Sequence, residues 1–322
     1  MAVVALIVAT GAAVRLTGSG LGCPDWPSCY RHRLTAELSY HPAIEFGNRL
    51  VTVALTIILV VTFLAALRRR PFRRDLVWLS GGQVVGVVGQ AVLDGIVVYT
   101  KLNTYLVMVH FGLTMLMVAA AVVLVHRCSR DYRTGSGTVL VPRPVQLLGR
   151  GVVALLGVVI AAGTAVTGAG PHSGGPQGQL QPRRLPVALR SMAELHSTLA
   201  LLLVGVVLAL VVSLHALDVP ERVRRAGRIL MAVLVAQAAV GYIQYFTHLP
   251  ALLVEVHVIA ATSLAIGGVQ FLLAFTSHPS EPVPAGGGLP DELVGEPAAG
   301  STGSAGGQPG SPAPRDATLA GR

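Results

Sequence analysis

Three histidines lie inside long apolar runs of the chain, where an ionisable side chain is costly and usually functional: His110, His196 and His257. His196 and His257 fall near the same end of two predicted membrane helices, at similar depth. Two imidazoles facing each other across a helical bundle suit the axial ligation of a haem iron, whereas a small metal ion would need more ligands. The alternative is that these histidines only form hydrogen bonds between helices.

Asn48 and His110 form the corresponding pair in the first half of the chain. Asn is a poor ligand for iron, so this site would have at most one protein ligand. An iron with both axial positions filled suits electron transfer, whereas an open position suits exchange or chemistry on the bound molecule. We therefore expect two unlike haem sites, one closed by His196 and His257 and one open beside Asn48.

Glu45 and Arg49 flank Asn48 and are four residues apart, so they share one face of a predicted helix. The simpler interpretation is an ion pair at the membrane boundary. The chemical interpretation makes Glu45 the catalytic group that handles protons beside the open site, and gives Arg49 a haem propionate. The sequence leaves both interpretations open.

Cys23 and Cys29 enclose Cys-Pro-Asp-Trp-Pro-Ser-Cys in a predicted outer loop. Because the outer compartment is oxidising, we expect a disulfide between them. Their spacing is too wide for a Cys-x-x-Cys redox motif, and a zinc site would need further ligands. The bond is either structural or takes part in redox or partner transfer.

The composition excludes a soluble globular protein, because 52% of the 322 residues are apolar and only 12% are charged. Three cysteines are too few for a disulfide-rich secreted domain. The pI near 10.2 raises the question of nucleic acid, but most of the 24 basic residues lie in short loops between apolar runs. We expect the lipid bilayer as a partner and no nucleic acid.

Long apolar runs predict an all-α fold, a polytopic membrane protein with eight transmembrane helices. The expected spans are 1–15, 43–67, 76–98, 103–126, 147–168, 191–215, 226–247 and 251–275. The first run is short for a span. Fourteen arginines in three alternate loops face eight basic residues on the other side, and the positive-inside rule places the fourteen in the cytoplasm. This predicts a cell-membrane protein with both termini cytoplasmic.

The two halves of the chain match each other at an offset of 147, which pairs Gln90 with Gln237 and His110 with His257. Each half holds four predicted helices, so we expect two pseudo-symmetric four-helix bundles. The predicted parts are an N-terminal half with the open haem site, a cytoplasmic linker, a C-terminal half with the closed haem site and a disordered cytoplasmic tail, at 1–126, 127–146, 147–278 and 279–322.

With these motifs the chain resembles the heme A synthase family over about residues 1–275. The resemblance is most specific in five segments: Arg15 to Cys29, Glu45-Phe46-Gly47-Asn48-Arg49, Gln90 to His110, Thr167 to His172, and Gln237 to His257. Few other families would join the outer cysteine loop to a histidine-bearing repeat of eight helices.

The resemblance implies an enzyme that oxidises haem O to haem A for cytochrome oxidase. Two hydroxylations of the C8 methyl would be followed by loss of water to give the formyl group. It also implies a haem b cofactor on His196 and His257, a substrate haem at His110, and the family's acidic residue at Glu45. The implied partners are haem O and an electron donor that the sequence does not identify. A haem O synthase is a candidate source of the substrate, and the sequence does not show which partner supplies it. Whether the chain forms a homo-oligomer stays open.

The chain departs from the family in two places. Asn48 stands where the family has a histidine, which puts ligation of the substrate haem by two histidines in doubt, and the second outer loop has no cysteine. Asn48 therefore supports an alternative, a haem-binding electron-transfer or assembly protein without oxygenation activity. A transporter is a third hypothesis because of the parallel repeat, but the scarcity of interrupted helices argues against it.

Overall fold

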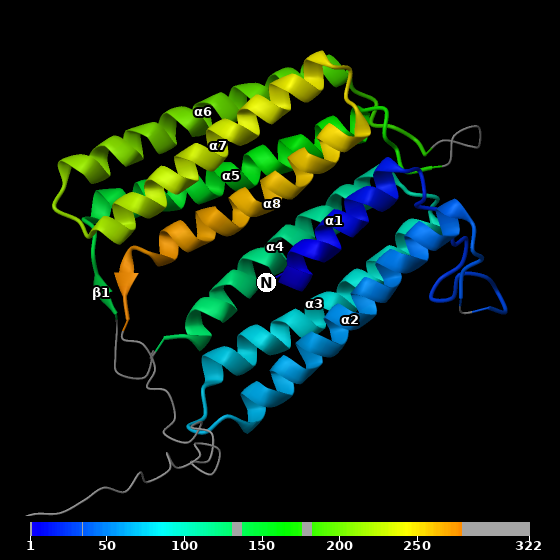
Figure 1. Cartoon of the computed structure of the whole chain (residues 1–322), viewed down its shortest axis with the longest axis horizontal. Coiled ribbons are helices and arrows are strands. Elements are labelled where there is room, and N and C mark those ends of the chain that lie inside the picture. The colour runs from blue at the N-terminus through cyan, green and yellow to red at the C-terminus, as the bar shows by residue number, and fades with distance from the viewer. Residues whose placement is uncertain (1, 34, 131–136, 176–181, 279–322) are drawn as a thin grey trace, which may run out of the picture. The chain divides into compact units, whose positions relative to one another are not determined.

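The computed structural model describes residues 2–33, 35–130, 137–175 and 182–278. Within these ranges the chain forms eight helices and two short strands. The helices are α1 (Ala2–Leu16), α2 (Tyr40–Arg68), α3 (Arg74–Tyr99), α4 (Thr104–Cys128), α5 (Arg143–Ala169), α6 (Leu189–Ala216), α7 (Glu221–Phe246) and α8 (Ala251–Leu273). They run side by side with their long axes roughly aligned (Figure 1). The predicted all-α fold is confirmed.

Seven of these helices, α2 to α8, are long and apolar enough to cross a membrane. Helix α1 has 15 residues and spans about 22 Å, less than the roughly 30 Å of a bilayer core. Many large apolar side chains on the spanning helices are exposed, among them Ile57, Leu116 and Leu202. Lipid tails satisfy such side chains as well as a protein core does, so the chain is a multi-pass membrane protein.

Packing between helices follows chain order in both halves. Helix α5 packs against α6 and α8, and α7 packs against α6 and α8, around a core that includes Val152, Leu203, Leu210 and Phe271. In the first half α2 packs against α1 and α3, and α3 against α4. The halves meet where α8 packs against α1 and α4, and where α4 packs against α5.

The internal repeat has the same local structure in both halves. Gln90 Nε2 donates to the carbonyl of His110 at 3.0 Å, and Gln237 Nε2 donates to the carbonyl of His257 at 2.9 Å. The turns after α3 and α7 each contain two consecutive residues with φ between 54° and 65°: Lys101 and Leu102, and His248 and Leu249. Because non-glycine residues rarely adopt this conformation, its recurrence at the offset of 147 confirms the correspondence between the halves.

The segment between α4 and α5 pairs, through a short strand, with the residues that follow α8. Strand β1 (Thr138–Val139) pairs antiparallel with β2 (Thr276–Ser277). Part of the predicted linker, 131–136, and the predicted tail, 279–322, lie outside the described residues.

Candidate functional site

His196 and His257 face each other between α6 and α8. Their ring centroids are 6.3 Å apart and the ring planes meet at 69°. The Nδ1 atom of His196 is 3.0 Å from the carbonyl oxygen of Val159, which leaves its Nε2 free to bind a metal. Within the described part of the chain, Nδ1 of His257 is buried and has no hydrogen-bond partner.

This geometry fits two axial ligands of one iron. A metal–imidazole bond of about 2 Å on each side places two ring centroids about 6 Å apart, as observed. A ligating histidine usually donates its other ring nitrogen to a carbonyl or carboxylate, as His196 does toward Val159. No group of three or more His, Cys, Asp or Glu side chains that could hold a metal ion occurs in the described ranges, which disfavours a small metal ion.

Two glycines leave room for these rings. A Cβ atom on Gly163 would lie 3.1 Å from Cε1 of His196, and one on Gly241 would lie 3.2 Å from Cε1 of His257. A larger residue at either position would push the imidazole out of its present orientation. Sequence reasoning did not identify either glycine as a residue that leaves room for a candidate ligand.

The corresponding residues of the first half are arranged differently. Asn48 lies on α2 and His110 on α4. Asn48 Oδ1 accepts a hydrogen bond of 2.8 Å from Thr10 Oγ1 of α1. Among the described residues, Nδ1 of His110 is buried without a partner, and Asp94 lies within electrostatic reach of His110. This half therefore holds one buried imidazole with an unpaired nitrogen and one amide whose oxygen is already occupied.

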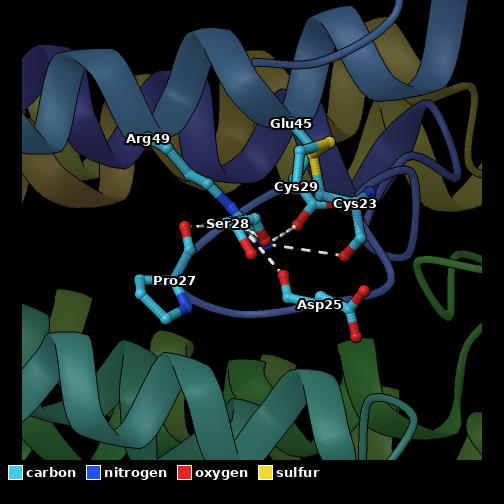
Figure 2. Close-up of a disulfide and its surroundings, with 7 residues drawn as sticks. All are labelled: Cys23, Asp25, Pro27, Ser28, Cys29, Glu45 and Arg49. Carbon is cyan, nitrogen blue, oxygen red and sulfur yellow. Dashed lines mark hydrogen bonds and ion pairs between the residues drawn. A yellow bond between two sulfur atoms is a disulfide. The ribbon is translucent and has the colours of Figure 1, made fainter. Parts of the chain in front are cut away.

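Glu45 and Arg49 form the predicted ion pair, with 2.6 Å between Glu45 Oε1 and Arg49 Nη2 (Figure 2). Glu45 is only 5% exposed, and its Oε2 accepts a hydrogen bond of 2.8 Å from the backbone amide of Cys23. Arg49 Nη1 donates to the carbonyl oxygens of Asp25 and Ser28, each at 3.1 Å. The pair therefore binds the backbone of the loop that contains Cys23 and Cys29.

The predicted disulfide between Cys23 and Cys29 is present, and both cysteines are fully buried. The loop that it closes also touches α3. Tyr99 Oη donates to the carbonyl of Trp26 at 2.8 Å, and the Trp26 ring lies so close to Gly95 that a Cβ there would be 3.1 Å away. The loop thus lies over the N-terminal end of α2 and the C-terminal end of α3, close to Glu45 and Arg49.

Arg15 joins the two halves at this end of the helices, a contact that the sequence did not predict. It donates to the carbonyl oxygens of His172, at 2.7 Å, and Thr167, at 2.9 Å. The backbone amide of Gly20 donates to the carbonyl oxygen of Gly174 at 2.9 Å. The available signal was a motif of Thr, Gly, a small residue and Gly that occurs at 17–20 and again at 167–170. Its two copies supply or adjoin these contact residues.

Comparison with known proteins supports one family. The model of the cytochrome oxidase assembly protein family matches residues 1–39 and 34–266. A heme A synthase from Geobacillus thermodenitrificans is 33% identical over 108 residues, which is 33% of each chain. A heme A synthase from Lysinibacillus sphaericus (strain C3-41) is 30% identical over 120 residues, 37% of this chain and 39% of the relative.

A longer alignment, at 24% identity, joins this chain to a heme A synthase from Bacillus mycoides (strain KBAB4). It covers 250 residues, 76% of this chain and 80% of the relative. The alignments to the first relatives span only about a third of their length. The family model covers far more than half of the chain, and the chain belongs to the cytochrome oxidase assembly protein family.

Proposed function

We propose that this protein is a heme A synthase, an enzyme that oxidises haem O to haem A during the assembly of cytochrome oxidase. The single observation that carries the proposal is the His196–His257 pair, 6.3 Å apart in a chain of this family. The relatives named heme A synthase, which align with up to 76% of the chain, support the same activity.

In the proposal, the C-terminal half (147–278) binds haem b through His196 and His257. Haem b, when bound, would supply one-electron transfer. The carbonyl of Val159 fixes the His196 ring, and the bond from Gln237 to the carbonyl of His257 fixes the backbone of α8 beside the second ligand. The two halves act as pseudo-symmetric four-helix bundles, and both termini lie in the cytoplasm.

The N-terminal half (1–126) binds the substrate, haem O. His110 would bind its iron, and Asn48 would not, because its oxygen already accepts a hydrogen bond from Thr10. Arg49 Nε, which is buried and without a partner among the described residues, is the group available to a propionate. Glu45 handles protons beside this site, since it is the buried carboxylate closest in sequence to Asn48.

Each of the two hydroxylations at the C8 methyl would use dioxygen, two electrons from the donor and two protons: one oxygen atom converts a C–H bond to C–OH, and the other leaves as water. The resulting hydrate then loses water to leave the formyl group of haem A. This chemistry needs two different sites. The N-terminal half would leave the substrate iron accessible, and the C-terminal half would carry electrons on haem b. A haem O synthase supplies the substrate, and a separate donor supplies electrons.

The experiment that tests this proposal counts and characterises bound haem. Full-length protein purified from cells that make haem O should hold one low-spin haem b and a second haem of different spin state. His257→Ala should remove the low-spin signal, whereas His110→Ala should remove the other. A single haem, or loss of both signals with either variant, would contradict two separate sites.

A further inference from the structure

A groove runs along an exposed side of α3 and α4, next to the proposed substrate site. Its volume is about 340 Å³, and its lining includes Gly82, Gly86, Gly89, Gln90, Leu113 and Met117. A Cβ atom on Gly82 or Gly89 would meet nothing within 4 Å, so these glycines leave open space rather than close helix contacts. The groove is apolar except for two glutamine side chains.

The groove is continuous with the residues around His110. Gln90 lines it and donates through Nε2 to the carbonyl of His110 at 3.0 Å. The Oε1 atom of Gln90 is buried and, within the described part of the chain, has no hydrogen-bond partner. This amide oxygen, which lines the groove, can accept a hydrogen bond from a hydroxyl group at the base of an apolar chain. Gln237 Oε1 is likewise unpaired among the described residues, so the oxygen supports such a contact without distinguishing the halves.

The repeat shows that the glycines lining this groove on α3 are particular to the first half. At the offset of 147, Ile229, Val233 and Ala236 on α7 stand at the positions of Gly82, Gly86 and Gly89. Helix α7, in the half proposed for haem b, therefore carries side chains where α3, in the half proposed for haem O, has glycines. Haem O differs from haem b by a hydroxyethylfarnesyl tail, which is an apolar chain with a hydroxyl at its base.

We propose that the groove between α3 and α4 binds the farnesyl tail of haem O and so selects haem O over haem b at the N-terminal site. From Gly82 to Leu93 the groove follows about 16 Å of helix, comparable with an extended farnesyl chain. Burial of such a chain contributes affinity in proportion to the apolar area that it removes from water and lipid headgroups. The inference rests on the proposed function, because it needs haem O as the substrate.

The test compares haem O with haem b as ligands of the N-terminal site in full-length protein whose other site already holds haem b. We expect the wild-type protein to bind haem O at least tenfold more tightly, measured by absorbance titration. The double variant Gly82→Ile, Gly89→Leu fills the groove and should lose most of this preference while its affinity for haem b stays the same. Gly82→Ile alone, which copies the residue at the repeat-related position, should lose part of it.

Gly205→Leu is the matched control, because Gly205 lies on α6 with open space around it and should keep the preference. An unchanged preference in the groove variants, or an equal loss of both haems, would overturn the inference. A changed oligomeric state in light scattering with an unchanged preference would assign the groove to contact between copies of the chain. Haem O that binds with preference but is not oxidised would refute the proposed function and leave the groove assignment standing.

Discussion

Replacing Arg49 with Met tests how the outer loop is held. The guanidinium of Arg49 donates to the carbonyls of Asp25 and Ser28 and pairs with Glu45 at 2.6 Å. The side chains of Arg49 and Glu45 are only 14% and 7% exposed, so water screens neither charge well. Arg49→Met keeps the apolar stem, removes the charge and leaves the Glu45 carboxylate buried without its ion-pair partner.

Breaking a buried ion pair by removing one partner costs about 3 kcal/mol or more. Cys23 and Cys29 are fully buried, so a reductant reaches their disulfide only when the loop opens locally. A loss of about 3 kcal/mol from the closed loop raises the open population by about 100-fold. The rate at which dithiothreitol reduces the disulfide should rise by a similar factor.

The assay exposes purified protein to dithiothreitol, stops the reaction with an alkylating reagent and measures the mass gained at Cys23 and Cys29. Arg190→Met is the control, because Arg190 and Glu194 have the same spacing and a 2.8 Å ion pair but side chains that are 82% and 62% exposed. Such an exposed pair contributes little, so its loss should leave the rate unchanged. A rate for Arg49→Met within threefold of wild type would refute the role of Arg49 in holding the loop.

Three further predictions concern the haem sites. His196→Ala and His257→Ala should each abolish the low-spin haem b spectrum, and full haem content with full activity in both variants would show that the cofactor assignment is wrong. Gly163→Val should weaken haem b binding at least tenfold, since a Cβ there would lie 3.1 Å from the His196 ring, whereas Gly157→Val on the same helix meets open space and should bind normally in the same titration. Asn48→His should convert the substrate haem from a five-coordinate to a six-coordinate, low-spin spectrum; an unchanged spectrum would place Asn48 away from the iron.

The helices could be predicted from the sequence because a membrane span must be a long apolar run with its backbone hydrogen bonds satisfied internally. Their ends could not: α2 begins at Tyr40 and α5 at Arg143, several residues before the apolar runs, because polar residues continue a helix at the membrane surface. The correspondence between the halves followed from matched residues such as Gln90 and Gln237, which make the same bond to α4 and α8.

The candidate site was predictable where the spacing of residues along a helix decides the contact. The Glu45–Arg49 ion pair follows from a separation of four residues, and it is present. The hydrogen bond from Thr10 to Asn48 and the loop carbonyls around Arg49 join segments that are far apart in the chain. Such contacts depend on the path of the loop and on the packing of α1 against α2, which periodicity does not encode.

The central claim, that this chain oxidises haem O, is tested most directly by the mass of the haem that it produces. The full-length protein is co-expressed with a haem O synthase in cells that make no haem A, and the haem is extracted and measured by mass spectrometry. Wild-type protein should yield haem A, and the His257→Ala variant should leave haem O unconverted. Haem O alone in the wild-type extract, with no haem A and no alcohol intermediate, would contradict the claim and favour a haem-binding protein without oxygenation activity.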